Sequence, residues 1–228
     1  MGILICGLNG TGKSTLGRML AGRMGYEFID NEDLYFPKTD SAYIFSGSRS
    51  KEEVIRLLEE RIAGNSRFVF AAVRGDYGNK LIASLDQIIL IDVPKQIRNQ
   101  RIRNRSFQKF GTRILPGGDL FEKENSWFRL TESRPEDYVE KWLETVHCPV
   151  IRIDGTLPVD ENVNHLAAAL SEKNGPPLYG YNQELVIYSN CGHNVDTDIP
   201  DELADEADRF LEQTDGGGNK DGIKQGIP

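Results

Sequence analysis

Short apolar runs alternate along the chain with longer stretches in which apolar residues recur every three or four positions. The apolar runs predict strands at Gly2–Cys6, Tyr26–Ile29, Arg67–Val73, Gln87–Val93 and Pro149–Ile153. The third and fourth of these runs are apolar on both faces, which is typical of central strands in a parallel sheet. Strands that alternate with helices predict βαβ units, and therefore an α/β fold with a parallel sheet.

The stretches with helical periodicity lie between these runs. They predict helices at Lys13–Met24, Lys51–Ala63, Pro94 to about Arg105, Ser133 to about Val146, and Val159–Leu170. Proline in the first turn favours the helix that follows Pro94. The spacing of Ser133 and Glu136 is that of a capping box, which predicts the start of another helix. The stretch Ser106–Ser133 contains glycines and is expected to be irregular.

Composition and charge separate a body from a tail. The chain has 228 residues, 39% of them hydrophobic, and a net charge of −8 that comes entirely from the residues after 173. We expect a domain at 1–173, a linker at 174–183, a strand–helix appendage at 184–213 and a disordered acidic tail at 214–228. A body with balanced charge does not indicate nucleic-acid binding.

Cysteine use and hydropathy indicate the compartment. The three cysteines Cys6, Cys148 and Cys191 are far apart, and no CxxC pair occurs. This pattern is typical of a reducing environment, so we expect a cytoplasmic protein, either a monomer or a dimer. No apolar run reaches the length of a membrane span, and the N-terminus lacks the pattern of a signal peptide.

A glycine-rich motif follows the first predicted strand. The sequence Gly7-Leu8-Asn9-Gly10-Thr11-Gly12-Lys13-Ser14 fits the P-loop pattern G-x-x-x-x-G-K-[ST], with a strand before it and a helix after it, as its mechanism requires. Glycines allow the backbone N–H groups to curl around phosphate oxygens, and the helix N-terminus adds positive potential. The pattern predicts that Lys13 bridges the β- and γ-phosphates of ATP and that Ser14 holds Mg²⁺.

With this motif close to its N-terminus, the chain resembles the small P-loop kinases, such as adenylate, shikimate and gluconate kinase, over about residues 1–170. The resemblance implies a three-layer fold with a five-stranded parallel sheet of order 2-3-1-4-5 and a lid. It also implies transfer of the γ-phosphoryl group of ATP, with Mg²⁺, to a small acceptor, either a nucleotide or a polar metabolite. The residues that it places on the nucleotide are Gly7, Asn9, Gly10, Thr11, Gly12, Lys13, Ser14, Thr15 and, in a later loop beside the base, Gly155.

Acidic residues follow the second predicted strand, in the sequence Asp30-Asn31-Glu32-Asp33. Shikimate and gluconate kinases carry an acidic pair at this place, which implies that Asp30 orients Mg²⁺ together with Ser14. Asp30 and Asp33 are candidate catalytic bases for the attacking hydroxyl, and Glu32 is a candidate acceptor-binding residue. The alternative is that Asp30 or Asn31 caps a helix.

Two arginines are candidates for holding an acidic acceptor. Arg74 lies in Ala72-Val73-Arg74-Gly75-Asp76, a sequence that departs from the corresponding strand ends of adenylate and shikimate kinase. Arg49 lies roughly where shikimate kinase keeps an acceptor-binding arginine. A solvent-exposed surface charge is the alternative for Arg49. Asp76 is a further candidate for assisting Mg²⁺.

A basic stretch runs from Arg98 to Arg113, and no acid occurs between Asp92 and Asp119. Within it, Arg101 and Arg105 are four residues apart and therefore share one face of a helix. In small P-loop kinases, arginines at this place close over the phosphates, which implies a lid at about 98–133 with Arg101 and Arg105 in catalytic roles. A solvated basic helix and an RNA-binding patch are the alternatives.

Other functions remain open beside the kinase. The sequence Leu90-Ile91-Asp92 resembles the hydrophobic run ending in Asp of ATPases that perform mechanical work, although no second acid follows Asp92 to activate water. One alternative is therefore an ATPase or GTPase coupled to conformational work. Another is a regulator that binds nucleotide with negligible turnover.

The tail carries a second, shorter resemblance. Residues 185–212 are similar to the end of an α/β-hydrolase, where a strand leads to a catalytic histidine. No G-x-S-x-G nucleophile motif occurs in the chain, so we expect His193 to be non-catalytic.

Overall fold

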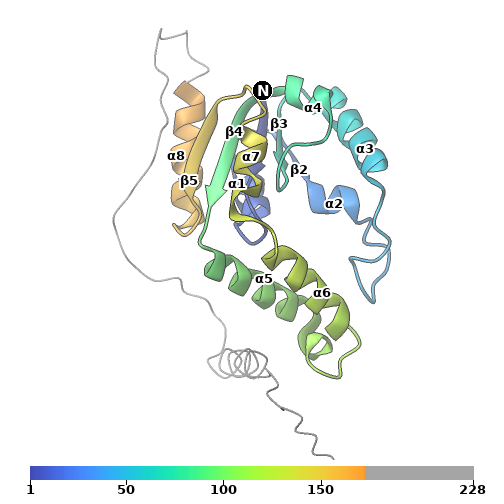
Figure 1. The fold of residues 1–228 in the computed structure, drawn as a ribbon. Coiled ribbons are helices and arrows are strands. Elements are labelled where there is room, and N and C mark those ends of the chain that lie inside the picture. Colours follow the sequence, from blue (N-terminus) through green and yellow to red (C-terminus); the bar gives the residue numbers. More distant parts are fainter. Residues whose placement is uncertain (173–228) are drawn as a thin grey trace, which may run out of the picture. The chain divides into compact units, whose positions relative to one another are not determined.

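The computed structural model describes residues 1–172, which form a parallel sheet with helices on both faces (Figure 1). Its strands are β1 (Gly2–Cys6), β2 (Glu27–Asp30), β3 (Phe68–Ala71), β4 (Leu85–Asp92) and β5 (Val150–Asp154). All pairs are parallel, and the order is β2-β3-β1-β4-β5. The predicted fold class and strand order are therefore confirmed, with strand ends shifted by a few residues.

Alternation along the strands divides the core into two layers. On β1, Leu4 and Cys6 face one cluster of buried residues, while Ile3 and Ile5 face the other. This division follows from the two-residue period of a strand, and both faces are apolar because helices cover both. All of β1 is buried, so the loop that follows it begins at the core of the sheet.

Helices α1 (Lys13–Met24) and α8 (Val159–Glu172) pack against each other on one face of the sheet. Helix α3 (Lys51–Gly64) and the short α4 (Asn79–Ala83) contribute to the opposite layer. The observed ends of α1, α3 and α8 lie within two residues of their predicted ends. Neither α4 nor α2 (Asn31–Tyr35) was predicted, because five residues are too few to show helical periodicity.

Two antiparallel helices extend beyond the carboxyl ends of the strands (Figure 1). Helix α5 (Lys95–Phe110) packs on α6 (Phe121–Glu132), and the 3₁₀ turn η1 (Gly111–Ile114) lies between them. The expectation of an irregular stretch at 106–133 is therefore wrong. The hairpin has its own small core, whose buried members are Ile102, Ile114, Leu120 and Phe128.

The segment after α6 also differs from its prediction. The residues Ser133 to Val146 form a 3₁₀ turn, η2 (Glu136–Tyr138), and one short helix, α7 (Glu140–Leu143). No side chain caps η2, so the predicted capping box does not form. The carboxylate of Glu136 instead pairs with Arg98 of α5, at 2.6 and 2.7 Å.

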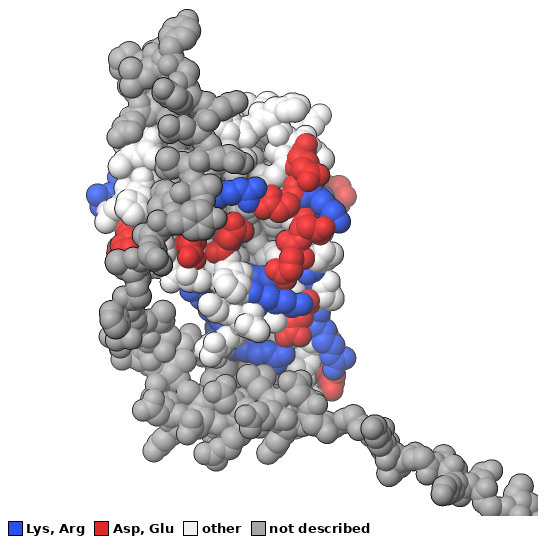
Figure 2. Space-filling view, turned by 60° about the vertical axis from the view of Figure 1, so that its left-hand side comes forward, with Lys and Arg blue, Asp and Glu red and all other residues white. Residues whose placement is uncertain are grey.

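Charges of both signs alternate on the face shown in Figure 2. Two ion pairs of the described residues are typical: Arg152 binds Glu140 at 2.5 Å, and Lys141 binds Asp137 at 2.8 Å. Among residues 1–172, no helix is long and apolar enough to cross a membrane. The predicted linker, the appendage with His193 and the acidic tail all lie outside the described residues.

Candidate active site

The loop between β1 and α1 has the backbone of a phosphate cradle. Gly7, Gly10 and Gly12 adopt positive φ angles of 144°, 82° and 93°, which non-glycine residues rarely adopt. At Gly10 a Cβ atom would also lie 2.4 Å from the carbonyl oxygen of Arg98. Because Gly12 is the N-cap of α1, the loop leads directly into the positive end of a helix dipole.

Lys13 is held against this loop. Its ammonium donates a hydrogen bond of 2.8 Å to the carbonyl oxygen of Leu8. Burial lowers the pKa of Lys13 to about 7, and the positive charges of Arg105 and Arg134 act in the same direction. Phosphate groups beside the ammonium would favour its charged form, so the loop is suited to an anionic ligand.

The cradle opens into a cavity of about 520 Å³ at the carboxyl ends of the strands. Parallel α/β sheets bind their ligands at this edge. The lining comes from the cradle and the start of α1, the ends of β2 and β3, α2 and the segment after it, and the two helices α5 and α6. Its members are Asn9, Gly10, Gly12, Lys13, Ser14, Thr15, Asp30, Asn31, Glu32, Tyr35, Phe36, Tyr43, Phe45, Ala71, Ala72, Val73, Arg101, Ile102, Arg105 and Trp127.

Two of the three candidate acids line this cavity. Asp30 ends β2 and caps α2, because its carboxylate accepts a hydrogen bond of 3.0 Å from the backbone nitrogen of Glu32. Asp30 therefore both caps α2 and lines the cavity, so the two alternatives given for it are compatible. Glu32 lies between two cations, 3.8 Å from Arg105 and 3.6 Å from Lys109.

Asp33, the third candidate acid, does not line the cavity. Its side chain is half-exposed and forms an ion pair of 2.5 Å with Lys38. Asp33 is next to Glu32 on helix α2, so its side chain leaves the helix in a different direction from that of Glu32. Sequence spacing alone did not separate these three acids.

Some of the basic residues on α5 line the cavity, and others form ion pairs elsewhere in the protein. Arg101 and Arg105 line the cavity, and Arg101 also donates to the carbonyl oxygen of Gly155 at 3.0 Å. Arg103 points elsewhere and pairs with Glu132 of α6 at 2.8 Å. Arg98 is buried beneath the cradle in its pair with Glu136. The shared helical face of Arg101 and Arg105 is thus as predicted.

The arginines predicted to bind the acceptor do not line the cavity. Arg49 donates to the carbonyl oxygen of Leu34 at 2.7 Å and lies 3.3 Å from Glu53. Arg74 pairs with Asp76 at 3.1 Å. In Asp76, burial raises the pKa, but hydrogen bonds from Lys51 and Arg74 outweigh it and hold the pKa below its usual range.

Gly155 lies beside the cradle rather than in the cavity lining. A Cβ atom there would lie 2.4 Å from Cγ2 of Ile91 and 3.1 Å from the backbone oxygen of Thr11. The position therefore requires glycine for close packing of the β5–α8 loop against β4 and the cradle. This steric requirement does not depend on contact with a nucleotide base.

Two features of the site were missed from the sequence. Arg134, which lies between the two residues of the predicted capping box, hydrogen-bonds through its guanidinium to the side chain of Asn9 in the cradle. The aromatic residues of the lining were not predicted either, because apolar residues outside a regular period normally indicate core.

The oxygen donors of the site fit Mg²⁺. Ser14 at the start of α1 and the carboxylate of Asp30 both line the cavity. Mg²⁺ prefers hard oxygen ligands and usually takes only one or two from the protein, together with substrate phosphates. Among the described residues, no group of three His, Cys, Asp or Glu side chains forms a self-sufficient metal centre.

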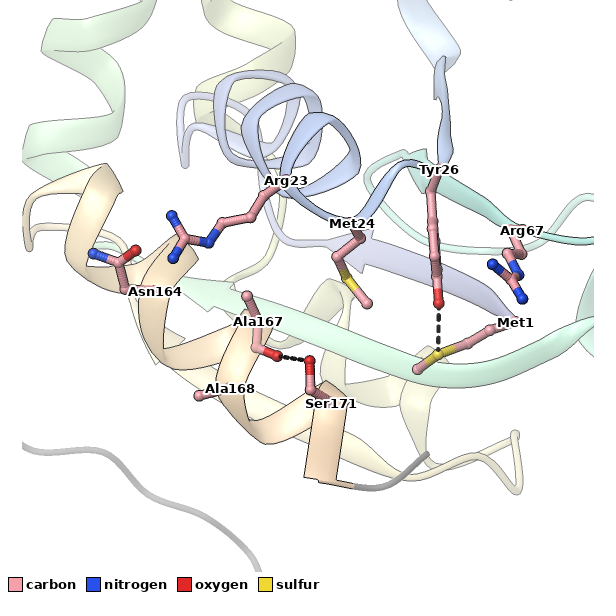
Figure 3. Close-up of a pocket in the computed structure, with 9 residues that line it drawn as sticks. All are labelled: Met1, Arg23, Met24, Tyr26, Arg67, Asn164, Ala167, Ala168 and Ser171. Carbon is pink, nitrogen blue, oxygen red and sulfur yellow. Dashed lines mark hydrogen bonds between the residues drawn. The ribbon is translucent and has the colours of Figure 1, made fainter. Parts of the chain in front are cut away.

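A second hollow, of about 810 Å³, lies at the opposite edge of the sheet (Figure 3). Met1 precedes β1, Met24 ends α1 and Arg67 precedes β3, so the hollow is at the amino ends of the strands. Neither a carboxylate nor a glycine-rich loop lines it. It is larger, but the groups needed for phosphate chemistry lie in the first cavity.

No protein-family model matches the chain. An uncharacterised protein, YqaC, of Bacillus subtilis is 29% identical over 177 residues, which cover 74% of this chain and 97% of the relative. A shikimate kinase of Pelotomaculum thermopropionicum is 27% identical over 183 residues, covering 75% and 96%. A cytidylate kinase of Stutzerimonas stutzeri is 30% identical over 100 residues, covering 44% and 40%.

Among solved structures, a shikimate kinase from Acinetobacter baumannii in complex with shikimate has a TM-score of 0.46 and 20% identity, covering 75% of this chain and 94% of that one. Strand order and the cradle after β1 give the chain the fold of the P-loop NTPases. The two relatives above that have a stated activity are kinases of small molecules. They differ in their acceptors and leave this chain's acceptor open.

Proposed function

We propose that the protein is an ATP- and Mg²⁺-dependent kinase that transfers the γ-phosphoryl group to a hydroxyl of a small acceptor. One observation carries this proposal: Lys13 of the cradle, the acids Asp30 and Glu32, and the arginines Arg101 and Arg105 all line one cavity. A cation for phosphate, a carboxylate for a proton and guanidinium groups for developing charge are the parts that phosphoryl transfer needs.

Each side chain has a distinct role in this proposal. Lys13 binds the β- and γ-phosphates, and Ser14 and Asp30 hold Mg²⁺, which neutralises phosphate charge when bound. Asp30 accepts the proton of the acceptor hydroxyl. As the hydroxyl oxygen bonds to the γ-phosphorus, the bond to the β-phosphate oxygen breaks and ADP leaves. Arg101 and Arg105 stabilise the charge that spreads over the transferring group.

The chemistry also requires that water be kept from the phosphorus. The hairpin of α5 and α6 supplies one wall of the cavity and carries Arg101 and Arg105. Closure of such an element over bound nucleotide excludes water and limits ATP hydrolysis. We therefore propose that the hairpin is the lid.

The test is ADP formation by the full chain with ATP and Mg²⁺, with and without a pool of hydroxyl-bearing metabolites. The proposal expects ADP formation to depend on the pool. It also expects Lys13→Met to lose more than about nine-tenths of the rate, since the ammonium stabilises charge in the transition state. ADP formation independent of any acceptor would favour the work-coupled ATPase, and nucleotide binding without ADP formation would favour the regulator.

A further inference from the structure

Aromatic rings form part of the wall of the cavity. Tyr35 and Phe36 come from the end of α2, Tyr43 and Phe45 from the segment before α3, and Trp127 from α6. The rings are held by one another: the centroids of Phe36 and Phe45 are 5.3 Å apart at an interplanar angle of 69°, and those of Tyr43 and Phe45 are 5.7 Å apart at 82°. Edge-to-face pairs of this kind are favourable, so the wall is preformed.

The wall offers ring surface rather than hydrogen bonds. The hydroxyl of Tyr43 donates to the buried carboxylate of Glu124 at 2.7 Å, and the hydroxyl of Tyr35 is hydrogen-bonded with Tyr77. An acceptor with many hydroxyl groups would lose its water there and find few partners. A flat, apolar ring would lose few hydrogen bonds to water and would gain van der Waals contact with the aromatic side chains.

The cations expected to hold an acidic acceptor already have other partners. Arg49 and Arg74, the cations that would hold an acidic acceptor, are used elsewhere and do not line the cavity. Lys109 lies over the ring of Phe45, 4.6 Å from its centroid, and its ammonium is 3.6 Å from Glu32. A carboxylate on an acceptor lying against Phe45 would meet Glu32, which already pairs with Arg105 and Lys109.

Polar groups line the same cavity as the aromatic rings. Asp30 and Glu32 are among them, and Oδ1 of the lining residue Asn31 is buried with no hydrogen-bond partner among the described residues. An acceptor with both a ring and a hydroxyl-bearing arm would match both kinds of lining group at once.

We propose, building on the kinase function above, that the acceptor is a neutral alcohol carrying a planar ring, of the nucleoside class. The ring lies against Phe45 and Trp127, and the hydroxyl points to Asp30. The hydroxyl oxygen takes the γ-phosphoryl group, its proton passes to Asp30, and ADP is released. A polyhydroxy acid is the wrong chemistry for this wall.

The experiment compares single acceptors with the full chain, ATP and Mg²⁺. Adenosine, guanosine, cytidine and thymidine are each tested beside shikimate and gluconate at equal concentration, with ADP formation as the readout and mass spectrometry to find the phosphorylated product. At least one nucleoside should raise ADP formation about tenfold or more above the acceptor-free rate. Stimulation by none of the nucleosides overturns the inference, whichever other compound reacts.

Variants of the wall provide a second test. Phe45→Leu and Trp127→Leu keep apolar bulk but remove the ring face, so KM for the nucleoside should rise by about tenfold while KM for ATP stays within about twofold. Tyr26→Leu, at the opposite edge of the sheet, is the matched control and should change neither. Unchanged acceptor KM in both folded variants would overturn the inference.

The kinase function itself is tested separately by the metabolite pool. Transfer to a pool member without a ring would refute the nucleoside inference and leave the kinase intact. Absence of acceptor-dependent transfer from any pool would refute both.

Discussion

Arg98 donates to both carboxylate oxygens of Glu136, at 2.6 and 2.7 Å, while its Nε donates to the carbonyl oxygen of Val93 at 3.0 Å. The side chain of Arg98 is 4% exposed and that of Glu136 is 60% exposed. The backbone of Arg98 lies against Gly10, so the pair supports the cradle from below. Arg98 is thus a structural residue in a basic stretch that otherwise suggested phosphate contact.

Removing the partner of this arginine should destabilise the fold. Glu136→Gln leaves the buried guanidinium of Arg98 without its counter-charge, and we expect the free energy of unfolding to fall by about 1–3 kcal/mol. Asp137→Asn, which breaks the exposed pair with Lys141, is the control and should cost less than about 0.5 kcal/mol. Urea unfolding measures both, and equal effects in the two variants would contradict this role.

Nucleotide binding should take up protons near neutral pH through Lys13. Burial lowers the pKa of this lysine to about 7, so about half of the free protein carries a neutral amine at pH 7. Phosphates favour the ammonium, so ATP affinity should be higher below pH 7 and decrease as the pH rises.

Calorimetry in two buffers of different ionisation enthalpy measures this uptake. We expect about half a proton per ATP at pH 7 from Lys13, absent in Lys13→Met. The same uptake in the wild type and the variant would show that another group titrates.

The lid arginines should act mainly on turnover. Arg101→Ala and Arg105→Ala should each lower kcat by about tenfold or more while KM for ATP changes less than about threefold, because their contacts complete the transition-state site on closure. Arg103 on the same helix pairs with Glu132 instead of lining the cavity. The control variant Arg103→Ala should therefore have little effect on kcat. Parallel losses of ATP binding and turnover would assign Arg101 and Arg105 to the ground-state site.

The two flanking acids should behave differently. Asp30→Asn removes the proposed base and should lower kcat by about a hundredfold or more. Asp33→Asn should leave kcat within about threefold, because that carboxylate lies outside the cavity and pairs with Lys38. Steady-state kinetics decides, and a large loss in Asp33→Asn would restore it as the catalytic base.

The fold was largely predictable because its signals are local. The apolar run at Gly2–Cys6 and the glycine motif after it determine a strand, a turn and a helix through backbone requirements alone. Strand order followed from the resemblance and is confirmed by the pairing. Strand ends differed because they depend on the pairing partner.

The hairpin helix α6 was not predicted because a buried acid interrupts its apolar face. Glu124 occupies a core-facing position between Leu120 and Phe128, and it is tolerated there because the hydroxyl of Tyr43 donates to it. That partner lies 81 residues away in the sequence. The same long-range packing brings the aromatic wall to the site, and for this reason no sequence period revealed it.

The central claim is tested most directly by following the γ-phosphoryl group itself. The full chain is incubated with Mg²⁺ and ATP labelled at the γ-phosphorus in the presence of small alcohols, including nucleosides, and the label is traced by mass spectrometry. The account predicts label on the acceptor, in an amount that matches the ADP formed and is lost in Lys13→Met. Label found only in inorganic phosphate, at a rate that no acceptor changes, would contradict it.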